Sequence, residues 1–250
     1  MGERRNLRLV VEYDGSRYHG SQAQAPGLRT IQSVLDEALR VTFDEPVKSI
    51  FASRTDAGVH ALGQVVNVRT SSRIPVERLP LALATRLPDD IAVTEASEAS
   101  PAFHARFDAT GKAYAYAIWR RATTHPFWVA RSWHVPQRLD VEAMAAAGRQ
   151  WLGRQPFDSF ASVHRSVKTT TRELRRIELE AAEQVLWLHF EADGFLYNMV
   201  RIMVGTLVEM GLGRRAAGDA AAILAARDRR CAGRTAPARG LHLLRVEYGG

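Results

Sequence analysis

The same order of strand-like and helix-like segments occurs twice along this 250-residue chain. In each segment, apolar residues either alternate as in a strand or recur at helical spacing, and turn-forming residues separate the segments. The first half is predicted to hold strands at 7–13, 47–53, 64–70 and 91–96, and helices at about 31–39 and 76–85. The second is predicted to hold strands at 110–120, 171–181, 185–192 and 241–248, and helices at about 140–152, 195–210 and 219–227. Two β-α-β-β-α-β units predict an α+β fold of two tandem ferredoxin-like half-domains, with antiparallel sheets flanked by helices.

The boundary between the predicted half-domains falls at residues 103 and 104, so they span 1–103 and 104–250. No stretch rich in Pro, Ser and Gly separates them. Without a flexible linker, the halves are expected to enclose a tight cleft, and ligand sites often occur at such junctions.

Positive charge is concentrated in the second part of the chain. The first hundred residues carry 12 basic and 13 acidic side chains, whereas the remaining 150 carry 22 and 14. Of the basic residues, 31 are arginines, whose planar guanidinium suits phosphates and bases. A GC-rich genome explains the high ratio of arginine to lysine but not this asymmetry. The asymmetry therefore favours a nucleic-acid partner.

One apolar run, 195–213, approaches the length of a membrane span. It contains Asn198, Arg201 and Glu209, which are costly in hydrocarbon, so a buried helix is expected and no membrane partner is predicted. The chain shows no signal peptide, and its single cysteine, Cys231, cannot form an internal disulfide. These features predict a cytoplasmic protein.

The segment 54–61 (RTDAGVHA) joins two predicted strands and concentrates Arg54, Asp56 and His60 between apolar neighbours. A hairpin needs two to five residues, and this connection takes about ten, which favours a functional loop. The alternative is that Asp56 and Gly58 only form the turn.

Two further groups of residues suggest binding. Arg201 lies in an apolar helical segment, where it requires a carboxylate or a phosphate unless it reaches the surface. The segment 103–107 (FHARF) precedes Lys112 and Tyr114. Aromatic side chains among cations hold unstacked bases, although these residues also fit a core beside a basic strand.

Other signatures are missing from the sequence. There is no phosphate-binding GxxxxGK[ST] loop, no GxSxG elbow and no histidine or cysteine spacing typical of a metal site. The segment 211–216 matches GxGxxA but follows a helix rather than a strand. We therefore predict that the protein uses no cofactor and no metal.

Taken together, these segments resemble the tRNA pseudouridine synthase A family. The resemblance spans nearly the whole chain in family order, and RTDAGVH is highly specific. The matching stretches are 12–15 (EYDG), 54–60 (RTDAGVH), 63–65 (GQV), 103–107 (FHARF), 199–201 (MVR), 204–205 (VG) and 240–241 with Leu243.

The resemblance implies a cofactor-independent isomerase that converts uridine to pseudouridine at positions 38, 39 and 40, in the anticodon stem-loop of tRNA. It also implies a homodimer. Asp56 is then the nucleophile, Tyr114 the aromatic residue that contacts the target base, and Arg201 the basic partner of Asp56. The substrate-binding residues implied with Tyr114 are Arg54, His60, Gln64 and Arg106.

This sequence departs from the family pattern at Ser21, where a tryptophan is usual, at Ala84, where an asparagine is usual, and at Ala113, where an arginine is frequent. These departures bear on RNA contacts, domain packing and the range of substrates more than on the reaction. A carboxylate nucleophile could attack the sugar carbon or the base ring, and the sequence leaves both open. Two other classes remain possible: a non-catalytic RNA-binding protein that uses the same basic cleft, and a small-molecule enzyme, which would leave the basic second part unexplained.

Overall fold

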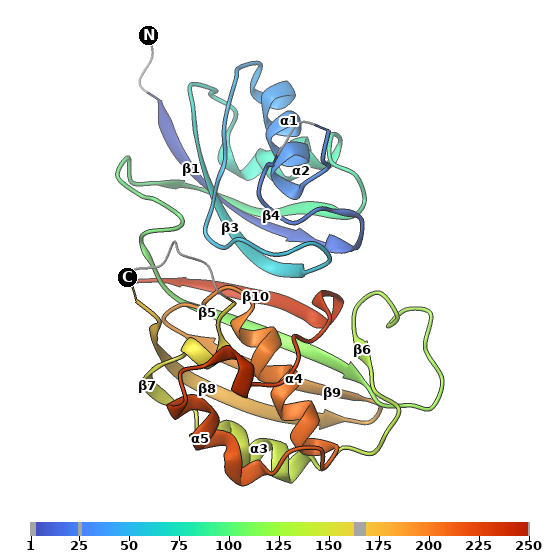
Figure 1. The fold of residues 1–250 in the computed structure, drawn as a ribbon. Coiled ribbons are helices and arrows are strands. Elements are labelled where there is room, and N and C mark those ends of the chain that lie inside the picture. Colours follow the sequence, from blue (N-terminus) through green and yellow to red (C-terminus); the bar gives the residue numbers. More distant parts are fainter. Residues whose placement is uncertain (1–3, 25–26, 163–168, 250) are drawn as a thin grey trace. The chain divides into compact units, whose positions relative to one another are not determined.

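The computed structural model describes residues 4–24, 27–162 and 169–249 of a mixed α+β protein (Figure 1). The chain divides into two compact units. Unit 1 consists of Met1–Thr110 and His242–Gly250, and unit 2 consists of Gly111–Leu241. The sequence predicts that the final strand, 241–248, belongs to the second half-domain. In the structure, all of this strand except its first residue belongs to unit 1.

Unit 1 is built on strands in the order β4-β1-β3-β10. Strand β1 lies between β3 and β4 and is antiparallel to both, while β10 runs parallel to β3, with His242 opposite His60. The short strand β2 pairs with β3. The strands are β1 (Arg5–Tyr13), β2 (Ile50–Phe51), β3 (His60–Thr70), β4 (Ile91–Ala99) and β10 (Leu241–Tyr248).

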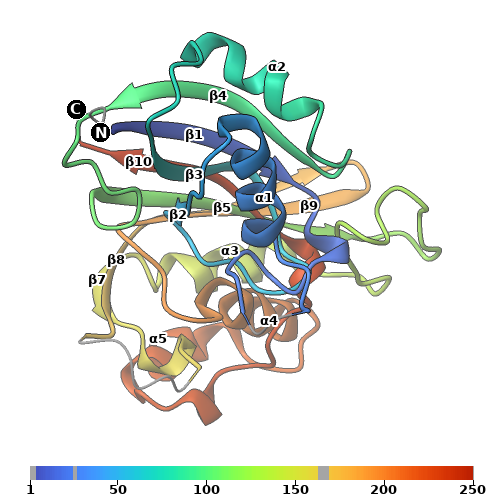
Figure 2. The ribbon, with the colours of Figure 1, turned by 90° about the horizontal axis from the view of Figure 1, so that it is seen from above.

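The helices of unit 1, α1 (Ile31–Phe43) and α2 (Leu79–Ala84), cover one side of these strands (Figures 1 and 2). Helix α1 begins at a capping box, in which the Thr30 side chain accepts from Ser33 N while the Ser33 hydroxyl accepts from Thr30 N. Its buried apolar residues recur at helical spacing and pack towards the sheet: Ile31, Leu35, Ala38, Leu39 and Phe43.

In unit 2 the strand order is β5-β9-β8-β7, antiparallel throughout, and β6 pairs with β5 in parallel. Helices α3 and α4 pack against each other, and α3 also contacts β8. Figure 1 shows these helices on one side of the strands. The elements are β5 (Ala109–Trp119), β6 (Trp133–His134), α3 (Val141–Arg149), β7 (Gly153–Pro156), β8 (Thr171–Ala182), β9 (Val185–Ala192), α4 (Met199–Gly211) and α5 (Ala220–Ala225).

Most predicted segments form the expected type of element, and the differences have local causes. The segment 47–53 forms only the two-residue β2, while β3 begins at His60 rather than Gln64. The segment 76–85 starts as a 3-10 turn before α2. Helix α4 starts at Met199, because Asn198 adopts a left-handed conformation with φ of 61° that a helix cannot continue through.

The apolar run 195–213 contains the buried helix α4. Its polar residue Glu209 is half-buried and pairs with Arg215 at 3.2 Å. No helix in the part of the chain that the structure describes is long and apolar enough to cross a membrane.

Candidate active site

Asp56 lies on a loop between β2 and β3 that turns tightly. Its carbonyl accepts a hydrogen bond from Val59 N at 3.1 Å, and Gly58 takes a φ of 80°, which glycine adopts without strain. Along this loop Arg54 is exposed, Thr55 is buried and Asp56 is half-buried. The loop therefore leaves Asp56 partly accessible while burying the residue before it.

Thr55 anchors the loop to the segment that follows β1. Its N–H donates to the Ser21 hydroxyl at 2.9 Å, and its carbonyl accepts from Ser21 N at 3.0 Å. Gly20, beside Ser21, has a φ of 91°, and a Cβ there would lie 2.9 Å from the Thr55 carbonyl oxygen. Ser21 is fully buried, so the serine that departs from the family pattern holds the backbone next to Asp56.

A second anchor joins the loop to β1 and β3 through Gln64 and Tyr13. The fully buried Gln64 amide accepts from Ser53 N at 3.0 Å and donates to Ser53 O at 2.8 Å and to the Tyr13 hydroxyl at 3.2 Å. The Tyr13 hydroxyl also pairs with the Thr55 hydroxyl at 2.8 Å. Burial raises the pKa of Tyr13 to about 12, so this hydroxyl keeps its proton at neutral pH.

A third contact holds the end of the loop against the turn after β1. A Cβ on Gly15 would lie 2.0 Å from the Val59 carbonyl oxygen, so only glycine allows this approach. The buried His60 places Nδ1 at 3.3 Å from Gly15 N and at 3.2 Å from Asp14 Oδ1. Its ring stacks on His242 at 4.8 Å between centroids.

The segment 103–108 forms a second rigid loop in unit 1. Ala105 N donates to Asn67 Oδ1 at 2.9 Å, and the Tyr248 hydroxyl donates to Ala105 O at 2.7 Å. On the outside of this loop, Phe107 is 73% exposed and stacks on His104 at 4.2 Å, with the Arg106 guanidinium 5.6 Å from its ring centre. An exposed ring with a cation beside it is a suitable platform for an unstacked base.

Tyr114 and Arg201 belong to unit 2. Tyr114 is buried in the middle of β5, opposite Phe190 of β9, and meets Phe195 edge-to-face at 5.2 Å. Arg201 is half-buried in the first turn of α4. Its Nε donates to Ala236 O at 2.8 Å, and its Nη1 donates to Asn198 Oδ1 at 2.9 Å.

The first turn of α4 is electropositive. It contains no acidic residue, and the Asn198 side chain does not cap the helix but bonds with Arg201 and Ser162. A helix N-terminus carries partial positive charge, and Arg201 adds a full one. This end of α4 is therefore suited to a carboxylate or a phosphate, the partners that the sequence predicted for Arg201 unless its side chain reaches the surface.

The structure thus brings Asp56, Arg54, His60 and Gln64 together around one loop of unit 1, and places Arg106 on another loop of that unit. The buried amide of Gln64 and the buried ring of His60 hold the backbone of the loop, while their role in binding substrate stays a prediction. Sequence reasoning missed Tyr13, Ser21 and Tyr248 as residues that hold these loops, because their partners lie far away along the chain. Within the described residues, no group of His, Cys, Asp and Glu side chains is arranged to hold a metal ion.

The family model described as tRNA pseudouridine synthase matches residues 9–108 and 147–249. Similar proteins named tRNA pseudouridine synthase A occur in several bacteria. The one from Acetivibrio thermocellus is 44% identical over 98% of this chain and 100% of its own length. The one from Moorella thermoacetica is 46% identical over 97% and 99%, and that from Geobacillus kaustophilus 43% identical over 97% and 94%.

The chain therefore belongs to the tRNA pseudouridine synthase family. This family consists of isomerases that convert uridine in tRNA to pseudouridine. The family predicted from the sequence is confirmed, and so is the class of enzyme.

Proposed function

We propose that this chain isomerises uridine to pseudouridine in the anticodon stem-loop of tRNA, at positions 38, 39 and 40, with Asp56 as the nucleophile. The observation that carries the proposal is the loop of Asp56. Three sets of contacts, from Ser21, from Gln64 with Tyr13, and from Gly15, fix its backbone, while Asp56 itself stays partly accessible. A rigid backbone that presents an accessible carboxylate is what a positioned nucleophile requires.

The reaction rearranges bonds without adding or removing atoms. The bond between C1′ and N1 breaks, the uracil turns, and a bond between C1′ and C5 forms, while C5 loses a proton and N1 gains one. Asp56 forms a transient covalent bond either with the sugar carbon or with the base ring, and that bond breaks before product leaves. The proposal holds for either point of attack.

Each of the other residues has a physical role in this scheme. In this scheme Arg201, at the positive end of α4, is the basic partner of the Asp56 carboxylate. The ring of Tyr114 contacts the target base, and its hydroxyl moves the proton of C5. Arg54, exposed beside Asp56, and Arg106, exposed beside Phe107, bind the nucleotides around the flipped uridine.

The fold that we propose for this chemistry is the tandem ferredoxin-like arrangement, with half-domains 1–103 and 104–250. Unit 1 supports it, since its helices and strands follow the order β1-α1-β2-β3-α2-β4. We further propose that the enzyme acts as a homodimer in the cytoplasm. Analytical ultracentrifugation tests the dimer, and a sedimentation mass of one chain at micromolar concentration would refute it.

The decisive experiment compares wild type with Asp56→Asn on an unmodified tRNA transcript, with pseudouridine detected by chemical derivatisation and mass spectrometry. Turnover should fall below about one percent of wild type, while the Kd for tRNA changes little, because most affinity comes from phosphate contacts. Asp89→Asn is the matched control, since it removes an exposed carboxylate of the same unit and should leave turnover unchanged.

Three results would contradict the proposal in different ways. Turnover by Asp56→Asn above the stated limit would remove Asp56 as the nucleophile. Tight tRNA binding by a wild type that makes no pseudouridine would instead identify a non-catalytic RNA-binding protein. Pseudouridine formed only outside the anticodon stem-loop would refute the proposed target positions.

A further inference from the structure

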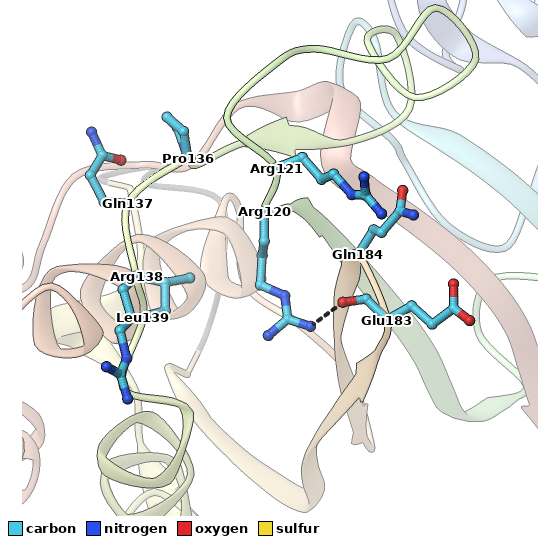
Figure 3. A pocket seen from close by; sticks show the side chains of 8 residues that line it. All are labelled: Arg120, Arg121, Pro136, Gln137, Arg138, Leu139, Glu183 and Gln184. Atoms are coloured by element: carbon cyan, nitrogen blue, oxygen red, sulfur yellow. Dashed lines mark hydrogen bonds between the residues drawn. The ribbon is translucent and has the colours of Figure 1, made fainter.

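A hollow of about 780 Å³ in unit 2 gathers three arginines (Figure 3). It lies where β5 ends, beside the turn between β8 and β9 and the segment before α3. Its polar lining consists of Arg120, Arg121, Arg138, Gln137, Gln184 and Glu183. None of these residues belongs to the candidate active site.

Arg120 has a structural role in the hollow, because its hydrogen bonds hold the turn between β8 and β9. Its backbone N donates to Gln184 O at 2.9 Å, and its Nη2 donates to Glu183 O at 3.0 Å, the bond drawn in Figure 3. Glu183 has a φ of 37°, a left-handed conformation that is unfavourable for a residue with a side chain. Arg120 thus fixes the turn that forms one wall. Its Nε is buried and makes no hydrogen bond with any described residue.

The guanidinium groups of Arg121 and Arg138 are exposed and lack ion-pair partners among residues 4–24, 27–162 and 169–249. Among the described residues that line the hollow, Glu183 is the one carboxylate, and it forms no ion pair with Arg121 or Arg138. In Figure 3 its carboxylate points away from Arg120. The hollow therefore keeps an excess of positive charge that the described protein does not neutralise.

Other arginines of unit 2 show the contrast. Arg176 pairs with Glu191 at 2.9 Å and also with Glu178, and Arg230 pairs with Asp228 at 2.6 Å. Gathering like charges is unfavourable unless an anion offsets their repulsion. Guanidinium groups and the amides of Gln137 and Gln184 line the hollow together, and both kinds of group donate hydrogen bonds to phosphate oxygens.

We propose that this hollow binds phosphates of the RNA backbone, at a site separate from the residues that perform the reaction. The inference rests on the proposed function for the identity of the RNA. Because guanidinium groups contact phosphates without reading bases, the site contributes affinity and orientation but no sequence preference. Each contact formed releases counterions, which makes its contribution measurable through salt.

The test uses the double variant Arg121→Gln/Arg138→Gln, which removes two unpaired charges and leaves Arg120 to hold the turn. The matched control is Arg176→Gln/Arg230→Gln, which removes two charges already neutralised within the protein. The Kd for an unmodified tRNA transcript is measured from low to high KCl by fluorescence anisotropy. The turnover number at saturating tRNA is measured in parallel.

At near-physiological salt the double variant should bind tRNA about tenfold more weakly, and its plot of log Kd against log salt should lose about 0.7–0.9 of slope per lost contact. The control should keep nearly the wild-type slope. Turnover at saturating tRNA should stay unchanged in both. Equal slopes in the double variant and its control would overturn the inference.

Competition with inorganic phosphate tests whether the hollow binds phosphates of the RNA backbone or a small free anion. At matched ionic strength, millimolar phosphate should not weaken tRNA binding by wild type beyond the effect of the salt. The opposite result has two parts: phosphate weakens tRNA binding by wild type but not by the double variant, and the double variant keeps the wild-type slope of log Kd against log salt. That result would show a site for small anions and overturn the inference. If wild type binds tRNA with the expected slope but makes no pseudouridine, the proposed function fails and the phosphate site stands.

Discussion

Alkaline pH should destabilise unit 1 through Tyr13, and Tyr13→Phe should remove that effect. The Tyr13 side chain is only 5% exposed, and burial raises its pKa from 10.0 to about 12. Above pH 10 the unfolded chain releases this proton while the folded chain retains it. The contribution of the neutral Tyr13 hydroxyl to the free energy of unfolding is therefore fully present below pH 10. It is lost as the pH rises from 10 through 12.

The size of the effect follows from the two pKa values. Each pKa unit between the folded and the unfolded chain corresponds to about 1.4 kcal/mol. The free energy of unfolding therefore falls by about 1.4 kcal/mol at pH 11, and the decrease approaches about 2.7 kcal/mol above pH 12. At neutral pH, Tyr13→Phe costs about 1–3 kcal/mol, because Thr55 and Gln64 lose a buried hydrogen-bond partner. The gap in stability between wild type and variant should therefore narrow by about 1.4 kcal/mol between pH 8 and pH 11.

Urea unfolding followed by far-UV circular dichroism at pH 8, 9.5 and 11 measures this gap. All five tryptophans lie between Trp119 and Trp187, so tryptophan fluorescence follows unit 2 and serves as an internal reference. Other groups that titrate in this range are present in both proteins, and their effects cancel in the difference. A gap that stays constant from pH 8 to pH 11 would show that Tyr13 is not buried as a neutral hydroxyl, and the account of the loop would have to be abandoned.

Three further predictions concern the site. Tyr114→Phe should lower tritium release from C5-labelled tRNA by roughly 10²–10⁴-fold if the hydroxyl moves the proton; release near the wild-type rate would leave the ring with a stacking role alone. Phe107→Ala should weaken tRNA binding by about 1–3 kcal/mol while Phe107→Trp preserves it, and the exposed Leu81→Ala is the control; equal Kd values for Phe107→Ala and Leu81→Ala would exclude the platform. Gly15→Ala should destabilise unit 1 by about 1–3 kcal/mol in urea unfolding and lower turnover, because its Cβ collides with the Val59 carbonyl; full turnover would show that the loop tolerates displacement.

The sequence was sufficient for the local elements and for the family. Period-two alternation in β1 and helical spacing in α1 identify which residues face the core. An element that buries one face carries apolar residues at the period of that element, so the pattern is visible in the sequence. The motif 54–60 also identified the loop on which Asp56 lies. The sequence also indicated a turn at Gly58, because glycine is typical of turn positions with a positive φ.

The element boundaries were less predictable where tertiary contacts act. Strand β3 extends back to His60, and its first residues pair with β10, which comes from the end of the chain. Helix α4 starts late because Asn198 leaves helical geometry. Neither feature has a periodic signal, because a pattern of apolar residues records which face is buried and not which strand covers it.

The contacts that hold the candidate site arise only in the folded chain. Ser21, Gln64 and Tyr13 meet around Thr55, and Tyr248 reaches Ala105 from the far end of the sequence. The three arginines of the phosphate site likewise come from the end of β5 and from the segment before α3. The order of residues was thus enough to predict most of the elements, to recognise the family and to propose which residues carry the chemistry. Which distant side chains hold the Asp56 loop, and which arginines lack an ion-pair partner among the described residues, became visible only in the folded chain, because hydrogen bonds and charge balance depend on distances in space.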